Sequence, residues 1–563
     1  MPFKNALTSY RNLIGSALTL FVVLLGATTH LDAKPFIFYR GVVHAASFAP
    51  PGSPAGVIPQ GGLFSIFGKE IGPAEAAQVT AFPLGAELAG VGLTVTQDDT
   101  VVDAIPVFVR AGQVNVIMPS DAPLGEVSIR VTFNGETSNP VRVTVVAHGP
   151  GIFTANQFGI GPGIVQNFIA ADNRPTNSNR VTAQRGQLVT IWLTGLGAIE
   201  GADNQAPTVG TLPYEVEVFF GGVKATQIDY AGRAPCCSAV DQVNALIPLE
   251  TPTGCFVSLT VRVNGAVSNT VTMAIGEDPA ACADPHNPFS ETLVSGGKQG
   301  NVVLLRQEFL DETVGARPFE HTLDVFSAQF TDYPGGPFAF NPNNSLPPPG
   351  SCTSYTFQGD ILEDATVAAT ASGALTAGSI AVTTPAGVVQ ATAIPPAMTL
   401  YAALLGHTID IVDFPTVPLK LEPGGATVTA NGGDVGAFEA DVTITAPVTW
   451  TNRAALDSIN RANGVRFEWQ GEAQVILAGM STEMASNSSG VFLCVASPGA
   501  TSFDVPDYAL TNLPRSRFTR AQTRAYLLLL SMPPNQPTEF EADGLDYGGA
   551  VVIHAQMLGT VVR

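Results

Sequence analysis

An internal repeat is the feature that most constrains how this chain folds. Three blocks of sequence recur in the same order. The matching pairs are QVNVIMP at 113–119 with QVNALIP at 242–248, FNGETSN at 133–139 with VNGAVSN at 263–269, and SIF at 65–67 with TIW at 190–192. Matched blocks in one order predict two copies of a single structural unit between residues 61 and 275.

Each copy has the pattern of a β-hairpin. Residues 127–133 alternate between apolar and polar side chains, which is typical of a half-buried strand. Asn134 and Gly135 follow, and this dipeptide accepts the positive φ angles of a type I′ turn before residues 141–145 alternate again. Residues 257–275 repeat the design. Short, regularly spaced strands with Gly/Pro-rich turns predict a mainly β fold, with tandem immunoglobulin-like β-sandwiches of about 100 residues each.

The composition agrees with a folded chain that does not bind nucleic acid. Of 563 residues, 45% are hydrophobic and 13% are charged, and 57 glycines with 43 prolines stay below the share that marks low-complexity disorder. The length predicts about three to four domains. Asp and Glu number 47 against 26 Lys and Arg, a net charge of −21, so no basic excess is present to displace counterions from a nucleic acid.

Residues 1–33 predict an export signal. Lys4 and Arg11 precede an apolar run at 13–27, which has the length of a signal-peptide core and is short for a membrane span of about 20 residues. The alternative is an uncleaved anchor helix. Small residues return between Ala27 and Ala33, where we expect cleavage, and no second long apolar run follows. The sequence thus predicts a secreted, periplasmic or cell-surface protein with no membrane span after removal of the signal.

The cysteines agree with export, because disulfides persist in oxidising compartments. We predict structural disulfides among all six: Cys236, Cys237, Cys255, Cys282, Cys352 and Cys494. A bond between Cys236 and Cys237 would strain the peptide that joins them, so each is expected to pair with one of the next two cysteines, in either order. Cys352 and Cys494 then form the third bridge. The alternative, a metal site, lacks C-x2-C spacing and a nearby histidine.

Six motifs between residues 44 and 284 form a linked set. They are HAASF at 44–48, IFG at 66–68, GQVN at 112–115, GPGIFT at 149–154, TGLG at 194–197 and DQVN at 241–244. The set resembles the TIG/IPT type of immunoglobulin-like domain, and more narrowly the tandem β module of uncharacterised exported proteins of acidobacterial type. An Asn that commonly precedes the AAS triplet is absent. The resemblance implies export and two sandwiches, at 44–149 and 150–284, and brings no catalytic residues.

A different β-rich region follows the repeat. Pro279, Pro285 and Pro288 mark a linker, and strand-like runs then predict a β-rich domain at 296–445 and a C-terminal β-rich domain at 446–563. The C-terminal domain is similar to a region that often accompanies the tandem module in the same exported family. That similarity implies no function for it.

No catalytic, cofactor-binding or metal-binding residues are predicted. The seven histidines are scattered, without the H-x-H or H-E-x-x-H pairs that place two imidazoles on one metal. Residues 479–483, GMSTE, lack the final glycine of a G-x-S-x-G nucleophile elbow. Glycine-rich patches at 432–436 and 544–549 offer Asp434 and Asp546 to a Ca²⁺ ion, but they lack the calcium-loop pattern and are expected to be turns.

The three tryptophans admit two interpretations. Trp192, Trp450 and Trp469 would suit the stacking of sugar rings on an exported sandwich. Trp192 corresponds to Phe67 in the first copy, however, and a position that is aromatic in both copies predicts core packing. The other two lie in strand-like runs, so we expect core packing for them as well.

A local run of positive charge also admits two interpretations. Arg515, Arg517, Arg520 and Arg524 form the one such run in an acidic chain. We expect a solvated loop, and the alternative is a docking patch for an anionic polymer of the cell envelope.

The sequence therefore favours an exported, non-enzymatic surface or extracellular protein that acts as a scaffold, adhesion or binding module. Its expected partner is a protein or a glycan at the cell surface. The alternative is a carbohydrate-active or carbohydrate-binding domain within residues 296–563, with the immunoglobulin-like modules as accessories. Two carboxylates at the separation needed for glycoside hydrolysis would distinguish these hypotheses, and sequence does not show that separation.

Overall fold

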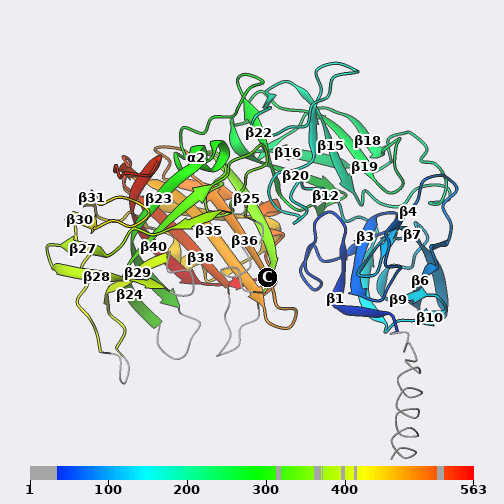
Figure 1. Cartoon of the computed structure of the whole chain (residues 1–563), viewed down its shortest axis with the longest axis horizontal. Helices are drawn as coiled ribbons and strands as arrows, with labels where there is room; N and C mark the ends of the chain where they lie inside the picture. Colours follow the sequence, from blue (N-terminus) through cyan, green and yellow to red (C-terminus); the bar gives the residue numbers. More distant parts are fainter. Residues whose placement is uncertain are drawn as a thin grey trace, which may run out of the picture.

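The computed structural model describes residues 34–311, 319–359, 369–370, 372–394, 400–410, 415–516 and 525–563. The predicted signal segment lies outside these residues. The described chain is mainly β and forms three consecutive parts: two sandwiches and a large C-terminal sheet domain (Figure 1). The predicted fold class is confirmed.

The first sandwich is built on one continuous path of strands. Its strands are β1 (Phe36–His44), β2 (Ile58–Pro59), β3 (Leu63–Lys69), β4 (Ala77–Gln78), β5 (Glu87–Leu88), β6 (Val91–Gln97), β7 (Thr100–Arg110), β8 (Gln113–Ile117), β9 (Gly125–Phe133), β10 (Glu136–Thr137) and β11 (Val141–Val146). The order is β1-β3-β8-β7-β6-β9-β11-β2. The long strand β7 pairs with β6 before an irregularity at Pro106 and Phe108 and with β8 around it, so the path folds over on itself. The enclosed core includes the fully buried Phe64, Ile66 and Ile129.

The second sandwich has two separate sheets. Its strands are β12 (Gly151–Ile152), β13 (Val165–Asn167), β14 (Ala183–Gln184), β15 (Leu188–Thr194), β16 (Val216–Phe220), β17 (Val223–Lys224), β18 (Ile228–Arg233), β19 (Asp241–Leu246), β20 (Gly254–Val263), β21 (Ala266–Val267) and β22 (Val271–Gly276). One sheet has the order β12-β15-β19-β18 and the other β14-β22-β20-β16-β17. Their facing side chains, among them Ile191, Val243 and Val261, form the core.

The two copies of the sequence repeat also share turn angles and hydrogen bonds. Asn134 and Gly135 have φ angles of 49° and 84°, and their counterparts at 264 and 265 have 45° and 85°, as the predicted hairpin turns require. The Ser-Asn pair after each turn also repeats. Asn139 Oδ1 accepts from Ile37 N and its Nδ2 donates to Ile37 O. Asn269 makes the same two bonds to Ile152, so each copy fastens its first strand in the same way.

A buried polar network joins the two sandwiches. The Arg233 guanidinium forms an ion pair with Asp241 and donates to the carbonyl oxygens of Gly61, at 2.7 Å, and Gly197, at 3.0 Å. Leu63 N of the first sandwich donates to Thr194 Oγ1 of the second at 2.9 Å. Because these groups are buried and hydrogen-bonded, the two sandwiches are held as a unit.

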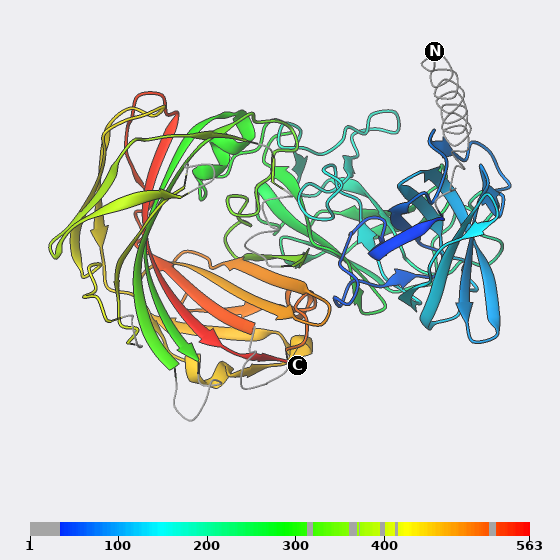
Figure 2. The ribbon, with the colours of Figure 1, turned by 60° about the horizontal axis from the view of Figure 1, so that its bottom comes forward.

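The C-terminal domain is dominated by one 14-stranded sheet. Its helices and strands are α2 (Phe289–Ser295), β23 (Gly297–Asp311), β24 (Phe319–Tyr333), β25 (Ser351–Gln358), β26 (Gly373–Leu375), β27 (Ile380–Thr384), β28 (Gly387–Ile394), β29 (Leu400–His407), β30 (Gly424–Ala430), β31 (Phe438–Ile444), β32 (Thr449–Trp450), η1 (Arg453–Leu456), β33 (Ser458–Ile459), η2 (Arg461–Asn463), β34 (Val465–Gln470), β35 (Gln474–Glu483), β36 (Ser488–Val495), β37 (Ser502–Val505), α4 (Asp507–Leu510), β38 (Ala525–Met532), β39 (Thr538–Glu539), β40 (Tyr547–Gly559) and β41 (Val561–Val562). The main path is β25-β36-β35-β38-β40-β23-β24-β29-β28-β27-β30-β31. Figure 2 shows that this sheet is strongly curved.

The main sheet crosses the boundary expected near residue 445. Strand β23 pairs in parallel with β40, which joins residues about 250 positions apart, and β25 pairs with β36. Residues 296–445 and 446–563 therefore do not form separate sheets. The hydrophobic cores do divide near this position: one is built mainly from residues 302–444 and the other mainly from residues 448–562.

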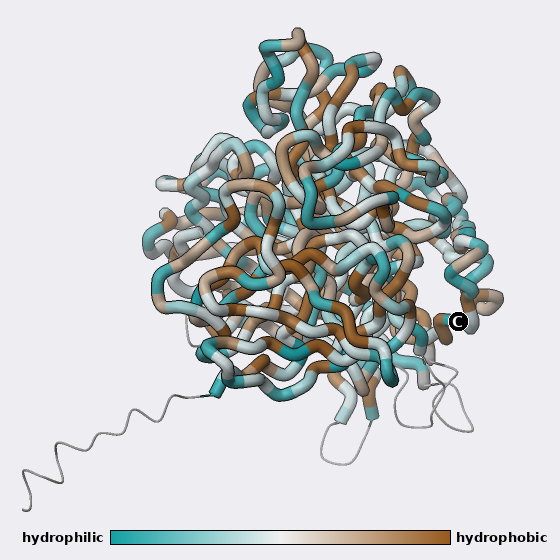
Figure 3. Tube along the Cα trace, turned by 90° about the vertical axis from the view of Figure 1, so that its right-hand side faces the viewer, coloured by the Kyte–Doolittle hydropathy of each residue, from teal (hydrophilic) through white to brown (hydrophobic). Residues whose placement is uncertain are grey.

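Apolar and polar side chains alternate along many strands, as expected where one face of a sheet is buried. In β31 every second residue from Phe438 to Ile444 is buried, and the residues between them are exposed. Figure 3 shows apolar and polar segments following one another at short intervals along the chain. No helix in the described residues is long and apolar enough to cross a membrane.

The cysteine pairing differs from the expectation. Cys236 bonds to its neighbour Cys237, and Cys255 bonds to Cys282. The prediction that each of the vicinal pair reaches one of the latter two is wrong, because both vicinal side chains lie exposed in the loop between β18 and β19, while Cys255 is a buried residue of β20. Cys352 bonds to Cys494 across β25 and β36, the pair expected by elimination.

Candidate functional site

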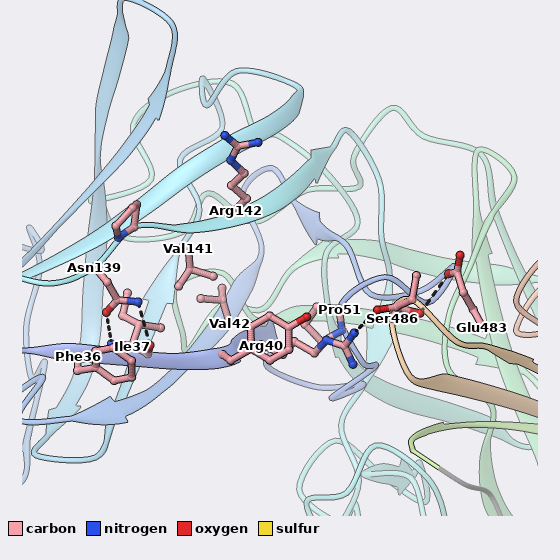
Figure 4. A pocket seen from close by; sticks show the side chains of 13 residues that line it. Phe36, Ile37, Arg40, Val42, Pro51, Asn139, Val141, Arg142, Glu483 and Ser486 are labelled. Atoms are coloured by element: carbon pink, nitrogen blue, oxygen red, sulfur yellow. Dashed lines mark hydrogen bonds between the residues drawn. The ribbon is translucent and has the colours of Figure 1, made fainter.

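A groove of about 640 Å³ lies where the first sandwich meets the C-terminal domain (Figure 4). We call it the aromatic groove. It is lined by Phe36, Ile37, Tyr39, Arg40, Val42, Pro51, Asn139, Pro140, Val141, Arg142, Glu483, Ala485 and Ser486. The first wall is β1, the second is the start of β11, and the third is the turn between β35 and β36. Segments far apart in the sequence thus share one surface.

Strand β1 presents aromatic rings to solvent because it is an edge strand with a bulge. It pairs with β3 alone, and the register shifts between Ile37 and Val42. Arg40 has a φ of 59°, a left-handed conformation that turns the chain within the strand. Phe36 is 51% exposed and Tyr39 is 84% exposed. Large aromatic side chains at this exposure contribute little to a core and indicate an interaction surface.

Arg40 connects the two parts of the molecule across the groove. Its Nη2 donates to the backbone oxygen of Ala485 at 2.9 Å. The same guanidinium lies 5.0 Å from the centroid of the Tyr39 ring, within the range of a cation–π contact. The Tyr39 ring is therefore held on the groove wall by a residue that is itself fixed to the C-terminal turn.

Planar polar groups surround the aromatic rings. The Asn139 amide bonds to the backbone of Ile37 through both its oxygen and its nitrogen. Arg142 Nη1 donates to Glu126 Oε1 at 3.0 Å, and Ser486 Oγ donates to Glu483 Oε2 at 3.1 Å. Each of these charged head groups uses one atom in its contact, so the guanidinium of Arg142 and the carboxylate of Glu483 keep further donors and acceptors for a ligand.

The groove combines exposed aromatic rings with polar head groups. Its lining contains no histidine or cysteine, and its one serine hydroxyl is held by Glu483. Exposed ring faces beside planar hydrogen-bonding groups give a ligand both apolar contact and directional bonds.

Two histidines, His44 and His148, make hydrogen bonds to the backbone and have structural roles. His44 is 2% exposed and bonds to the backbone of Gly149, Ala46 and Ser47. His148 lies 2.8 Å from the Leu196 oxygen. No group of three His, Cys, Asp or Glu side chains in the described residues is placed to hold a metal ion.

The remaining sequence candidates also have structural contacts. Ser481 is fully buried and donates to the Pro514 oxygen. Asp434 accepts from Thr376, and Asp546 accepts from Lys298 N, so the carboxylates of both glycine-rich patches are engaged within the fold.

The tryptophans do not form a sugar platform. Trp450 and Trp469 are 5% and 2% exposed and are cross-strand neighbours in β32 and β34, as core packing predicts. The expectation for Trp192 is wrong: it is half-buried and donates to Gln166 at 3.1 Å. Ile191 and Leu193 fill the core, and alternation along the strand turns Trp192 to the other face.

Of the arginine run, only Arg515 lies within the described residues, and it is exposed. Arg517, Arg520 and Arg524 lie outside them. The aromatic groove itself was missed by the sequence analysis. Its only local signal is FIFY at 36–39, a pattern that fits a buried strand equally well.

Comparisons with known proteins give no family. No family model matches the chain, and no curated protein matches it. Among solved structures, titin domains A168–A170 are 8% identical, cover 71% of this chain and 93% of their own, and have a TM-score of 0.12. SGBP-B of a Bacteroides ovatus mixed-linkage glucan utilization locus, solved with a heptasaccharide, is 11% identical, covers 88% of this chain and 96% of its own, and has a TM-score of 0.13. SGBP-B of a Bacteroides uniformis xyloglucan utilization locus is 11% identical, covers 84% and 97%, and has a TM-score of 0.15. Scores this low give these structures no weight for the function of this chain.

Proposed function

We propose that the protein is an exported, non-enzymatic binding protein of the cell surface or extracellular space, whose aromatic groove holds a carbohydrate chain. The observation that carries the proposal is the exposure of Phe36 and Tyr39 on a bulged edge strand that Arg40 ties to the C-terminal turn. A conformation that fixes exposed rings in place favours a ligand that stacks on them.

Carbohydrate is the ligand class that fits the lining. A sugar ring has an apolar C–H face, which packs on an aromatic ring, and hydroxyl groups, which bond to amide, carboxylate and guanidinium groups. The groove offers both: the rings on β1, and the heads of Arg142 and Glu483 on the opposite walls. We therefore propose a carbohydrate site at the junction of the first sandwich and the C-terminal domain, instead of one wholly within residues 296–563.

The rest of the molecule serves as a scaffold for the groove. Its walls come from the first sandwich and the C-terminal domain, so they stay in place only if the parts are fixed to each other. The second sandwich makes those contacts: Thr270 Oγ1 lies 3.0 Å from Ser354 Oγ, and the rings of Phe219 and Tyr508 stack with centroids 4.9 Å apart. With the buried joint at Arg233, these contacts support a single rigid body.

The test is retention of the full chain by a panel of immobilised polysaccharides, comprising β-glucans, xylans, mannans and uronic-acid polymers. We expect saturable binding to at least one member. Tyr39→Ala should weaken it about tenfold, since one stacking contact is lost. Phe158→Ala is the matched control, because Phe158 is a 47% exposed aromatic residue outside the groove, and it should leave binding unchanged.

Two results would overturn the proposal. One is the absence of retention on every polysaccharide. The other is an equal loss in Tyr39→Ala and Phe158→Ala, which would show that general surface hydrophobicity causes the retention. Release of soluble sugars from the retained polymer would contradict the non-enzymatic assignment.

A further inference from the structure

A second, strongly basic site lies where all three parts of the chain meet. Two adjoining hollows, of about 330 and 430 Å³, share Asn460, Arg515 and Arg563 in their linings. The hollow of about 330 Å³ is also lined by Pro54 of the first sandwich and by Gly265 in the β20–β21 turn of the second sandwich. We call the combined site the arginine hollow.

The charges around the arginine hollow are unbalanced. Arg262 on its wall is neutralised by Glu217 and by Asp507, whose Oδ2 lies 3.2 Å from its Nη1. Arg461 directs Nη1 to the backbone oxygen of Leu513 at 2.7 Å, a contact that carries no negative charge. Arg515 and Arg563 are exposed and add two more guanidinium groups, the second at the last residue of the sequence, whose main-chain oxygen accepts from Arg461 N at 3.3 Å. Asp507 is the one carboxylate side chain in either lining, and Arg262 already uses it.

The neighbouring positive charge changes the pKa of Arg461. Burial lowers the pKa of its guanidinium, and the nearby charge of Arg515 lowers that pKa further. The two guanidinium groups repel each other, which raises the free energy of the charged pair. An anion bound between them would offset this repulsion. In a chain with a net charge of −21, such a concentration of arginine is not a general surface property.

The backbone holds the site in shape without a ligand. Ser516 Oγ accepts from Val562 N at 2.8 Å, and Ser516 N donates to Val562 O at 3.0 Å. Asn460 Oδ1 accepts from Ala462 N at 3.1 Å, which orients the amide and leaves its Nδ2 as a donor. The donors are therefore preorganised on strand and turn backbone, which lowers the entropic cost of binding.

We propose that the arginine hollow binds an oxyanion, sulfate or phosphate, either free or as an ester group on a larger ligand. Guanidinium groups recognise such groups with paired N–H donors, and a neutral amide donor completes the set. Because the site borders all three parts, a bound oxyanion also ties them together. The proposal rests on different residues from those of the aromatic groove and stands or falls independently.

The first experiment is isothermal titration of the full chain with sodium sulfate and with sodium phosphate, with sodium chloride at equal ionic strength as the reference. We expect saturable binding at one site for at least one of the two anions. Calorimetry is preferred to thermal shift alone, because sulfate and phosphate stabilise folded proteins generally by exclusion from their surface.

Variants separate the arginine hollow from other basic surface. Arg515→Gln and Arg563→Gln should each weaken oxyanion binding at least about tenfold, since each removes a charged donor from an exposed position where folding does not depend on it. Arg110→Gln is the matched control, because Arg110 is an exposed arginine that lines neither site, and it should leave oxyanion binding unchanged. Absence of saturable binding, or equal affinity in Arg515→Gln and the parent chain, would overturn the proposal.

A second arm distinguishes the two sources of the oxyanion. Dextran sulfate and unmodified dextran are compared with inorganic sulfate. If dextran sulfate binds more tightly per sulfate group than inorganic sulfate does, and Arg515→Gln removes this difference, the ligand is an ester group on a polymer. Equal affinity per sulfate identifies the free ion. Retention of unmodified dextran that Arg515→Gln leaves unchanged reports on the aromatic groove and not on this site.

Discussion

At the residue scale, His44 shows how one tautomer of a buried side chain fixes a local structure. Its Nδ1 lies 3.2 Å from both Ala46 N and Ser47 N, which donate to it, and its Nε2 donates to Gly149 O at 3.0 Å. The neutral ring with a proton on Nε2 satisfies all of these contacts. A Cβ at Gly151 would collide with the ring, so the glycine at this position is required by the histidine.

His44 makes stability depend on pH. Burial lowers its pKa from 6.5 to about 4. Between these values the unfolded chain binds a proton that the folded chain excludes, so stability is complete above pH 6.5 and falls as the pH drops toward 4. We expect His44→Gln to remove about 3 kcal/mol of this pH dependence, measured as the difference in unfolding free energy between pH 7 and pH 4.

Comparison of variant and parent at each pH isolates this effect. Burial raises the pKa of the Asp284 carboxyl to about 7, which makes stability fall as the pH rises from about 4 to 7, the opposite direction. Identical pH dependence in His44→Gln and the parent chain would show that His44 does not carry the effect.

Arg233 is the residue on which the joint between the sandwiches depends. It is 2% exposed and its partner Asp241 is fully buried. Arg233→Met leaves a buried carboxylate without its cation and should destabilise the chain by about 3–5 kcal/mol in denaturant unfolding. The double variant Arg233→Met/Asp241→Asn removes that charge while keeping an acceptor for Leu196 N, and should recover much of the loss. No difference between the single and double variants would contradict this account.

At the element scale, the loop between β18 and β19 contains the most accessible disulfide. Cys236 and Cys237 are exposed, whereas Cys352 and Cys494 are 2% and 0% exposed. Mild reductant under native conditions should therefore free two thiols per chain at positions 236 and 237 first. Alkylation followed by peptide mass mapping measures this, and the Cys236→Ser/Cys237→Ser variant should show no early labelling. Earlier labelling of Cys352 or Cys494 would contradict the structure.

Local elements were predictable from the sequence where a short motif determines them. The turns at Asn134-Gly135 and at 264–265 follow from residues that accept positive φ, and the strands beside them follow from alternation. Which strand pairs with which could not be predicted in this way. Nothing in residues 297–311 indicates pairing with residues 547–559, because alternation reports which face is buried and not which strand lies alongside. For this reason the sequence does not show that the main sheet crosses the boundary expected near 445.

The aromatic groove was not predictable for a related reason. Strand β1 is exposed because it lies at an edge and carries a bulge at Arg40, and both properties depend on what the rest of the sheet does. The vicinal disulfide was missed because the steric argument against it considered only the two residues. The fold exposes their loop at the surface and pairs Cys255 with Cys282.

At the scale of the whole molecule, two sandwiches and a curved sheet domain meet so that both proposed binding sites lie between parts and not within one of them. The aromatic groove lies between the first sandwich and the β35–β36 turn. The arginine hollow lies at the junction of all three parts. Pro51 lines one and Pro54 lines the other, so a single loop of the first sandwich borders both sites.

The most direct test of the central claim is a crystal structure of the full chain with an oligosaccharide of the polymer that it retains. We predict sugar rings stacked on Phe36 and Tyr39, with hydroxyl groups within hydrogen-bond distance of Arg142 or Glu483. An oligosaccharide bound elsewhere on the chain, with the aromatic groove empty, would contradict the account.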